Sequence, residues 1–595
     1  MTIPYTCVIL PMIFSVAMCS DVAICSAQEK RGADIPWTTY KAEKMHTTGI
    51  VLGPKYEPYQ IETESSGQRC VKLRANGQFV EFTAAAPATA MVIRYSLPDN
   101  GRKSELGIYV NGKLVRQAEI SSYYAWLYGK YPFTNDAAAG SPRHFYDEIR
   151  LGGLRISVGD VIRVQYNDSD YCIIDLVDLE DPGPPLVAPP NSLSIADKSL
   201  VGDKSPGADK SLAGDHLTDD YTEALRNCIA KAVETGKTVW IPAGTFKITG
   251  DIVLPANVTV QGAGMWYTQL VGDDSLYTHA DRRVRLKGSG SNIHLADFAI
   301  VGNLNYRVDR EANDGIVGSF GTNSTISRIW IEHTKVGMWI ENSMNLKITG
   351  CRMRNTIADG INFCTGMAHS TIENCTARGT GDDCFAVWPT VSSAVKQQFP
   401  PGHNLIVHCT GQLPWLANGG ALYGGESNEI KDCLFVDISP GSAILLSTTF
   451  PTESKDKSIN NNFSGTTVID NCEIKTSGGF DHDWAWRAAV EVCLDKRSIA
   501  GIELRDLDIA NSLSNGISVI AKKDVAGANP VLAGAILQNV KLSGFGIGTK
   551  GSHGSLGPHD SHGLFISGDA AGSLVIKDSK IPEVKNESEG FRIVQ

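Results

Sequence analysis

Three aspartates near the middle of the chain have the spacing that acid and base catalysis requires. Asp382 and Asp383 are consecutive, and Asp359 lies 24 residues before Asp383. Carboxylates that are held close together raise one another's pKa, so one can stay protonated while another is ionised. Such a set can protonate a leaving oxygen and activate a water, as the hydrolysis of a glycosidic bond requires. The alternative is that each aspartate only caps a turn through its own backbone.

Aromatic residues accompany the three aspartates. Sugars present C–H faces that stack on aromatic rings, and a groove lined by such rings suits a long glycan chain. The alternative for any single ring is packing in the core. The candidate substrate-binding residues are Trp339, Phe363, Trp388, Trp415 and Tyr423.

A repeating pattern explains how residues 24 apart can meet. A branched or leucine anchor is followed three residues later by a small or apolar residue, and the shortest intervals between anchors are 22 and 24 residues. This period predicts a right-handed parallel β-helix, in which neighbouring coils lie ~4.8 Å apart. Asp359 and Asp383 each follow an anchor by eleven residues, so we expect them to lie one above the other. The anchors are Ile293, Ile326, Ile348, Ile372, Ile406, Ile430, Ile469, Leu504, Leu537 and Ile576.

Five cysteines occupy the position three residues after an anchor. Free cysteine behaves as a small buried apolar residue, so the pattern favours an inward stack of thiols over disulfide bonds. The five are Cys351, Cys375, Cys409, Cys433 and Cys472.

The region before the repeats has a different pattern. Short alternating strands, separated by turns such as Asn76-Gly77 and Asn111-Gly112, predict an antiparallel β-sandwich over residues 34–182. Asp181-Pro182-Gly183-Pro184-Pro185 cannot hold a strand ladder and marks its end. Residues 183–217 are predicted to be a linker and a polar insertion that repeats Asp-Lys-Ser, and residues 218–595 the β-helix, which opens with one short helix. The predicted fold class is therefore all-β.

Composition limits the partners and the location. The chain of 595 residues has a formal charge of -11, which argues against nucleic acid or an anionic membrane as the main partner. The apolar stretch from Val8 to Met18, followed by Cys25-Ser26-Ala27, predicts a signal peptide over residues 1–27 and a secreted or periplasmic protein. No second apolar run reaches the ~18 residues of a membrane-spanning helix.

Several segments together resemble glycoside hydrolase family 87, which contains α-1,3-glucanases and mycodextranases. The resemblance covers about residues 36 to 570 and is most specific from His333 to Gly425. Its segments are Tyr40-Lys41-Ala42-Glu43, His144-Phe145-Tyr146-Asp147-Glu148, Lys237-Thr238-Val239-Trp240-Ile241-Pro242, His333-Thr334-Lys335-Val336-Gly337-Met338-Trp339, Ala358-Asp359-Gly360-Ile361-Asn362-Phe363, Thr380-Gly381-Asp382-Asp383 and Asn418-Gly419-Gly420-Ala421-Leu422-Tyr423-Gly424-Gly425.

The resemblance implies an inverting hydrolase of a neutral α-glucan that needs no cofactor for catalysis. By similarity to polygalacturonases, Asp382 is the acid, while Asp359 and Asp383 hold the attacking water. In inverting enzymes the acid and the base are ~6.5–9.5 Å apart. The sandwich resembles family 35 carbohydrate-binding modules, and Glu43 and Asp175 correspond to positions that hold a structural Ca²⁺ in such modules.

Two alternatives remain. A polygalacturonase also carries an aspartate and an Asp-Asp pair on a β-helix, but its Gly-His-Gly and Arg-Ile-Lys tripeptides do not occur after Asp383. A β-helix that binds polysaccharide without cleaving it is the second. The presence of all three aspartates favours the enzyme.

Overall fold

The computed structural model describes residues 31–130, 133–197, 219–392, 394–455, 457–481, 485–549 and 559–595. The expected signal peptide and most of the Asp-Lys-Ser insertion lie outside these residues. Within them the all-β prediction is confirmed, since the regular structure consists of strands apart from four helices: η1 (Ala42–Lys44), η2 (Ser66–Gln68), η3 (Ala137–Ala139) and α2 (Thr222–Thr235). None of the described helices is long and apolar enough to cross a membrane.

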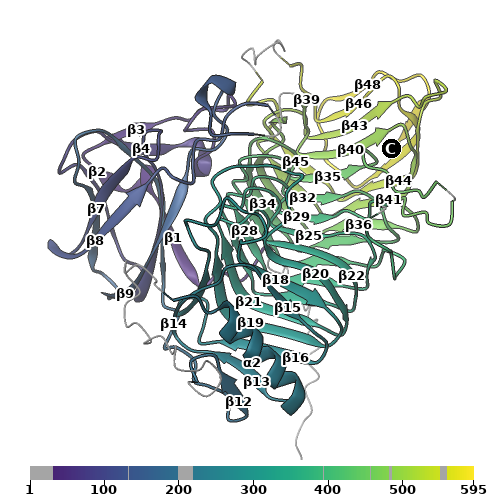
Figure 1. Ribbon diagram of the computed structural model, residues 1–595. Coiled ribbons are helices and arrows are strands. Elements are labelled where there is room, and N and C mark those ends of the chain that lie inside the picture. The colour runs from purple at the N-terminus through teal and green to yellow at the C-terminus, as the bar shows by residue number, and fades with distance from the viewer. Residues whose placement is uncertain are drawn as a thin grey trace, which may run out of the picture. The chain divides into compact units, whose positions relative to one another are not determined.

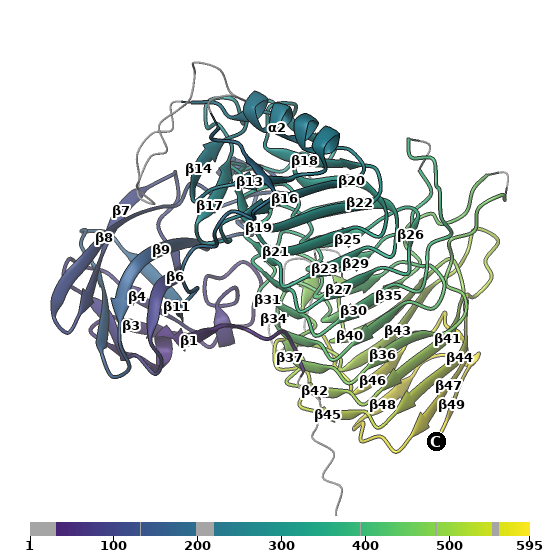
Figure 2. The ribbon, with the colours of Figure 1, turned by 90° about the horizontal axis from the view of Figure 1, so that it is seen from below.

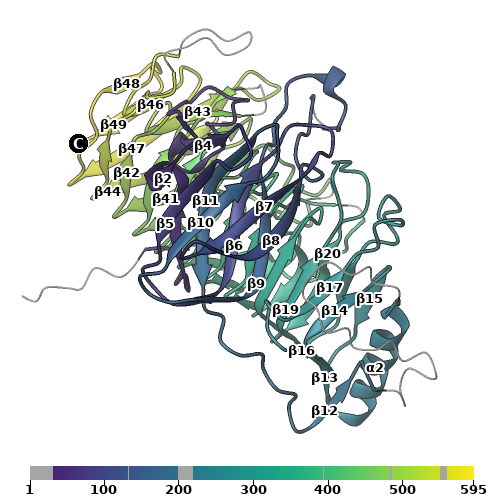
Figure 3. The same ribbon diagram turned by 90° about the vertical axis from the view of Figure 1, so that its left-hand side faces the viewer.

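The predicted sandwich is present between Trp37 and Glu180, with two antiparallel sheets (Figure 3). In β10, for example, Ile162, Val164 and Tyr166 are buried and alternate with more exposed residues, as a strand over a core requires. One sheet holds β1 (Trp37–Lys41), β3 (Ile50–Leu52), β4 (Cys70–Leu73), β6 (Ala88–Ser96), β9 (Asp147–Ile156) and β11 (Cys172–Glu180). The other holds β2 (His46–Thr47), β5 (Phe79–Thr83), β7 (Lys103–Val110), β8 (Lys113–Ser121) and β10 (Val161–Tyr166).

The second part of the chain is a parallel β-helix whose strands stack in three rows, visible as parallel arrows from teal to yellow (Figure 1). The first row holds β12 (Ser192–Ser194), β13 (Thr238–Ile241), β16 (Val258–Gly262), β19 (Ile293–Val301), β21 (Thr325–Glu332), β23 (Lys347–Thr349), β27 (Thr371–Glu373), β30 (Leu405–Val407), β33 (Glu429–Lys431), β36 (Thr467–Asp470), β41 (Ile499–Arg505), β44 (Val531–Gln538), β47 (Ala571–Lys577) and β49 (Phe591–Val594).

The second row holds β14 (Gly244–Lys247), β17 (Thr268–Val271), β24 (Arg352–Arg354), β28 (Thr376–Arg378), β31 (Thr410–Gln412), β34 (Leu434–Ile438), β37 (Glu473–Ser477), β42 (Asp508–Ala510) and β45 (Lys541–Ser543). The third row holds β15 (Asp251–Leu254), β18 (Arg285–Ser289), β20 (Gly315–Thr322), β22 (Met338–Met344), β25 (Ile361–Phe363), β26 (Met367–Ala368), β29 (Phe385–Val387), β32 (Gly420–Leu422), β35 (Ile444–Ser447), β40 (Val490–Asp495), β43 (Ile517–Lys522), β46 (Leu564–Ile566) and β48 (Val584–Asn586). A separate hairpin joins β38 (Phe480–Asp481) and β39 (Ala485–Trp486).

The anchors form one column, as the spacing predicts, with one correction. From Ile326 to Ile576 each anchor pairs with the next in the first row. The partner of Ile326 on the preceding coil is Leu295 rather than Ile293. The prediction for that coil was wrong by two residues because Ile293 and Leu295 both point inward on the same strand and are equally apolar.

A single helix lies at the start of the β-helix, where α2 packs against β13, β15 and β16 (Figure 2). Gly236 ends it with a φ of 65°, a conformation that glycine adopts without strain. The Asp220 carboxylate accepts a hydrogen bond from the Thr222 amide at 2.8 Å. Asp220 therefore satisfies the amide of the first helical residue, while Tyr221 stands at the N-cap position without a side-chain hydrogen bond.

Buried ion pairs join the sandwich to the second row of the β-helix. Arg378 donates to both oxygens of Glu148, at 2.6 and 3.1 Å, and to Asp178 at 2.8 Å. Arg352 also forms a bidentate pair, with Glu180, at 2.6 and 2.7 Å. Burial raises the pKa of Glu148, but Arg378 and then Arg354 hold it below its usual value. Glu148 is therefore ionised at the interface.

We expect Arg378→Gln to lower the free energy of unfolding by about 3–5 kcal/mol, because Glu148 and Asp178 would keep their charge without the cation between them. Urea unfolding gives this value. Lys103→Gln, which removes one partner of an exposed pair with Glu119, is the control and should leave the unfolding midpoint unchanged. Equal midpoints for the two variants would contradict the importance of this interface.

The predicted cysteine stack is confirmed. All five ladder cysteines are buried and free, as are the other six described cysteines. In the ladder the Cys351 amide donates to the Cys375 sulfur at 3.4 Å, and the Cys433 thiol donates to a carbonyl of its own coil at 3.1 Å. Each thiol therefore fills a small space in the core and satisfies its weak donor there.

Thiol titration of the denatured, unreduced protein should find at least eleven reactive thiols, since every described cysteine is free. Titration in the absence of denaturant should find almost none, because all eleven are buried. A count of one thiol after denaturation would mean that the cysteines are paired, and the ladder interpretation would be wrong.

Candidate active site

The three aspartates meet at the turns that lead into the third row of strands. Asp359 lies two residues before the start of β25 and Asp383 two residues before the start of β29, and these two strands pair in register. The Gly360 amide donates to the Asp383 carbonyl at 2.9 Å, so the two turns stack like the strands that follow them. One oxygen from each of Asp359, Asp382 and Asp383 lies within 4.8 Å of the other two. The sequence prediction that these side chains meet is therefore confirmed.

Glycines beside the aspartates allow the coils to approach. A Cβ on Gly360 would lie 2.4 Å from the Cys384 carbonyl oxygen of the next coil. A Cβ on Gly381 would lie 2.2 Å from the Ile357 carbonyl oxygen and from the Trp415 ring. Any side chain at these positions would push the turns apart, and with them the carboxylates.

The three carboxylates have different surroundings. Asp383 is almost fully buried and accepts hydrogen bonds from the Asn418 side chain and the Tyr423 hydroxyl, both at 2.8 Å. Asp359 is also buried, with the Asn362 amide at 3.4 Å. The Asp382 side chain is 25% exposed and accepts from Arg307 at 2.6 Å. Asp382 is thus the member of the trio that reaches furthest toward solvent.

Burial and mutual repulsion keep protons in the trio. Burial, followed by the charges of Asp382 and Asp383, raises the pKa of Asp359 well above its usual range. Burial and the charge of Asp382 raise the pKa of Asp383 to about 7, although Asn418 and Tyr423 lower it. Neutral pH therefore leaves protonated and ionised carboxyls side by side, and they titrate as a unit.

An open cleft of about 460 Å³ contains the trio. One wall is aromatic, with Trp339 and Trp388 at 5.2 Å between ring centroids, and Phe450 at 5.6 Å from Trp388 and 4.9 Å from Tyr423. Trp339, Trp388 and Tyr423 were predicted to line a groove, and they do. The sequence analysis missed Phe450, because it lies on an irregular loop after β35 where no repeat marks it.

The cleft is also lined by charged residues, which the sequence did not predict. Arg307, Asp309 and Glu311 lie on the irregular segment between β19 and β20, and Lys335 lies beside them. The Lys335 ammonium donates to the carbonyls of Asp309, at 2.9 Å, and Glu311, at 2.5 Å. Burial lowers its pKa to about 8. Sequence periodicity gives no signal for these residues, since the segment belongs to no repeat.

Two of the predicted substrate-binding residues lie elsewhere. Phe363 is fully buried in the core of the β-helix, because its side chain points inward from β25. Trp415 lies behind the aspartates, where its amide donates to the Thr380 carbonyl at 2.9 Å. The prediction of a role in the cleft was wrong for both, because spacing alone does not separate inward from outward side chains on short strands and turns.

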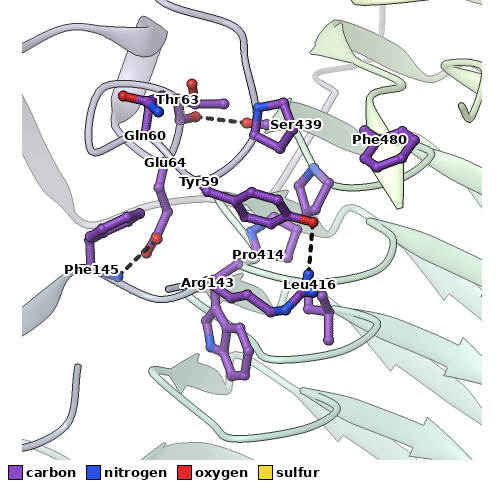
Figure 4. Close-up of a pocket in the computed structure, with 13 residues that line it drawn as sticks. Tyr59, Gln60, Thr63, Glu64, Arg143, Phe145, Pro414, Leu416, Ser439 and Phe480 are labelled. Atoms are coloured by element: carbon purple, nitrogen blue, oxygen red, sulfur yellow. Dashed lines mark hydrogen bonds between the residues drawn. The ribbon is translucent and has the colours of Figure 1, made fainter. Parts of the chain in front are cut away.

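Trp415 also lines a separate pocket of about 50 Å³ between the sandwich and the β-helix (Figure 4). Arg143 donates to the Tyr59 hydroxyl at 3.0 Å, and the Phe145 amide donates to Glu64 at 2.9 Å. The polar groups that line the pocket therefore form hydrogen bonds with one another. The pocket is therefore part of the packing that supports the Thr380 turn from behind.

Of the two residues expected to hold calcium, Glu43 and Asp175, Asp175 does not fit such a site. The Asp175 carboxylate is fully buried and bound by Arg94 at 2.6 Å and by the Ser66 amide at 2.9 Å. A bound Arg cation supplies the charge that Ca²⁺ would otherwise bring. Among the described residues, the only set of three acidic, thiol or imidazole groups with ligand-like spacing is the aspartate trio, where Arg307 already provides a cation.

Comparison with known proteins identifies the family. Residues 34–181 match the model of α-1,3-glucanase catalytic domain D1, and residues 218–550 match that of domain D2. The chain belongs to the α-1,3-glucanase catalytic-domain family. These α-1,3-glucanases are glycoside hydrolases of family 87, so the enzyme class expected from the sequence is confirmed.

Solved structures share the whole architecture. The catalytic unit of a thermostable family 87 α-1,3-glucanase from Streptomyces thermodiastaticus strain HF3-3 is 27% identical, with a TM-score of 0.76 over 95% of this chain and 96% of that one. The Agl-KA catalytic domain is 24% identical, with a TM-score of 0.80 over 95% and 98% of the two chains. A family 87 α-1,3-glucanase catalytic domain in complex with nigerose is also 24% identical, with a TM-score of 0.73 over 95% and 99%. The right-handed β-helix behind a sandwich is thus the fold of this α-1,3-glucanase family.

A curated phage protein matches a smaller part. The preneck appendage protein of Bacillus phage PZA is 28% identical over 206 residues, which are 33% of this chain. The chain spans only 23% of the length of that protein.

The raised pKa of Asp383 predicts a cost in stability. Between about pH 4 and pH 7 the folded protein holds a proton on Asp383 that the unfolded chain has lost, so this group lowers the free energy of unfolding as pH rises through that range. We expect Asp383→Asn to raise the free energy of unfolding by about 2–4 kcal/mol at pH 8 and to change it little at pH 4. Urea unfolding at both values measures this.

Asp382→Asn is the matched control for that experiment. It removes a carboxylate from the same turn, but one that is paired with Arg307, so no gain at pH 8 is expected. If Asp383→Asn gave no gain at pH 8 either, the raised pKa would be wrong.

Proposed function

We propose that the protein hydrolyses α-1,3-glucosidic bonds in a neutral α-glucan, α-1,3-glucan or nigeran, with inversion at the anomeric carbon. The observation that carries this proposal is the trio of carboxyls whose oxygens lie within 4.8 Å of one another, in a cleft with an aromatic wall. Family membership supports the linkage, and related family 87 catalytic domains have been solved with nigerose and with tetrasaccharides.

Variants of such relatives support the choice of residues. Their solved structures include three single aspartate-to-alanine variants, at two consecutive positions and at one position 23 residues before the first of them. In this chain Asp382 likewise follows Asp359 by 23 residues and is followed directly by Asp383. We therefore assign catalysis to these three aspartates.

The exposure of each carboxyl divides the roles. In the reactive form one of the protons shared by the trio resides on Asp382, which reaches the cleft and donates this proton to the glycosidic oxygen as the bond breaks. Asp359 and Asp383 lie deeper and bind the attacking water, and one of them takes the proton that this water loses. Two oxygens within 4.8 Å can share one water, since each hydrogen bond spans ~2.8 Å.

The burial of Asp359 and Asp383, rather than the distance between acid and base, supports inversion. The expected acid-to-base separation of ~6.5–9.5 Å is larger than the 4.8 Å within which oxygens of the trio lie. Inversion is instead inferred from how deeply Asp359 and Asp383 are buried. Asp383 is 2% exposed and Asp359 is 8% exposed, so a water is needed between either carboxylate and a sugar in the cleft. The hydrogen bonds from Asn418 and Tyr423 also make Asp383 a poor nucleophile.

The first test compares substrates. The protein is incubated with α-1,3-glucan, nigeran, dextran and polygalacturonate, and new reducing ends are measured. We expect release from α-1,3-glucan or nigeran and none from dextran or polygalacturonate. Cleavage of polygalacturonate would favour a pectin hydrolase, and binding without cleavage of any of the four would favour a non-catalytic protein.

The second test concerns the mechanism. NMR of the first products should show the β-anomer, because water attacks the face opposite the α-linked leaving group. Asp382→Asn should lower kcat by roughly 10³-fold or more, because the acid is lost. Asp578→Asn, at an exposed turn of another coil, is the control and should keep full activity. An α-anomer in the first products, or a glycosyl ester on one of the three aspartates, would contradict inversion.

We also propose that the protein is exported, as the apolar run from Val8 to Met18 and the small residues up to Ala27 predict. Mass spectrometry of protein from the medium or periplasm should find a chain that begins at Gln28. Protein that stays in the cytoplasm with residues 1–27 attached would contradict export.

A further inference from the structure

Arg307 connects the two coils that carry the aspartates. Its Nη1 donates to the Gly381 carbonyl at 2.6 Å and to the Ile357 carbonyl at 3.5 Å, and its Nη2 donates to Asp382 at 2.6 Å. Gly381 and Ile357 each lie within two residues of a proposed catalytic aspartate. One guanidinium therefore fixes both turns and one of the carboxylates.

The position of Arg307 is itself fixed from three sides. Its Nε donates to Asp309 at 2.8 Å, and its guanidinium lies 5.9 Å from the Phe133 ring of the sandwich region. The loop that carries it is held by the Lys335 ammonium through the carbonyls of Asp309 and Glu311. Arg307 is only 4% exposed, so its planar fork keeps one orientation.

Among the described residues, a small set of charged groups surrounds this contact. Asp309 and Glu311 lie on the loop of Arg307, Lys335 lies beside that loop, and Asp359 and Asp383 flank Asp382, with the Tyr423 hydroxyl on Asp383. Arg307 is the cation that touches the trio. Lys335 points to backbone carbonyls and repels Arg307.

We propose that Arg307 is a positioning residue for the acid, which holds Asp382 against the leaving oxygen and stabilises the carboxylate that forms when the proton is given up. This inference rests on the proposed function. In the step, the proton moves from Asp382 to the glycosidic oxygen and the C–O bond breaks toward that oxygen. The oxygen of the attacking water forms the new bond to the anomeric carbon, and a proton of that water passes to Asp359 or Asp383. Asp382 ends as the anion, paired with Arg307, and regains a proton from solvent.

Arg307→Gln should therefore change the pH dependence as well as the rate. Loss of a cation in contact with the trio raises the pKa of its carboxyls, by about one unit or more. The base then ionises at higher pH and the acid keeps its proton to higher pH, so both limbs of the pH profile of kcat move upward. We also expect kcat to fall by about 10²-fold, with a smaller change in KM, because the turns lose their alignment.

Two variants separate charge from structure. Arg307→Lys keeps the positive charge but loses the planar guanidinium with its several donors. It should therefore lower kcat, while the acidic and basic limbs of the pH profile of kcat stay near those of the wild type. Arg328→Gln removes a half-exposed guanidinium that pairs with Asp297 outside the cleft, and it should change neither rate nor profile. Circular dichroism and thermal unfolding establish that each variant is folded.

An infrared titration makes the test independent of turnover. The carbonyl band of protonated carboxyl groups is followed against pH in the wild type, Arg307→Gln and, as a reference for the trio, Asp383→Asn. An upward shift of the trio's titration in Arg307→Gln supports the inference even if the wild type cleaved no α-1,3-glucan, an outcome that would overturn only the proposed function. An unchanged titration and profile in folded Arg307→Gln would overturn the inference.

Discussion

The stacking of parallel coils in register is the constraint on which the rest of this structure depends. Each strand bonds to the next coil at ~4.8 Å, so the position of a residue within its coil fixes its neighbours above and below. The column from Ile326 to Ile576 shows that this register holds through insertions of different length. Loops can lengthen between strands because the strands, and not the loops, determine the stacking.

The same register places the chemistry. Asp359 and Asp383 lie close together because each lies two residues before the start of one of two strands, β25 and β29, that pair in register. Carboxylates at this distance repel one another, and burial adds to the cost. The core beneath them compensates through apolar residues and thiols that pack on every coil, so the trio is supported by a fold whose stability is distributed over many equivalent contacts.

Buried ion pairs attach the sandwich to the β-helix that carries the catalytic aspartates. Glu148, Asp178 and Glu180 meet Arg352 and Arg378 of the second row, all of them largely shielded from water. Removing one partner of such a buried pair lowers the stability of the fold. The bidentate geometry of an arginine with a carboxylate also restricts how the two domains can be oriented. Further along the same interface the Phe133 ring approaches Arg307. The interface between the sandwich and the β-helix therefore holds the two domains through the ion pairs and also contacts Arg307 in the cleft.

The sequence alone determined the fold class, the three aspartates and the cysteine ladder. The β-helix, the proximity of Asp359 and Asp383, and the cysteine ladder follow from a period of 22 to 24 residues. This period is a local property of the chain, and hydrogen bonding between coils converts it directly into proximity. It also placed Trp339, Trp388 and Tyr423 near the aspartates, but it did not separate them from Phe363, which points into the core. The direction of a side chain at the end of a three-residue strand depends on the turn geometry, which periodicity does not encode.

Only the tertiary structure decided the environment of each carboxylate. Arg307, Lys335 and Phe450 lie on irregular segments between strands, and the positions of such segments depend on what they pack against. The same holds for Asp175, whose partner Arg94 lies 81 residues away in the chain and replaces the cation that the sequence suggested. Charge and burial are properties of the space around a residue, and that space is filled by residues from distant parts of the chain. The sequence therefore determined which groups can react, and the folded structure determined which of them is held protonated, ionised or paired.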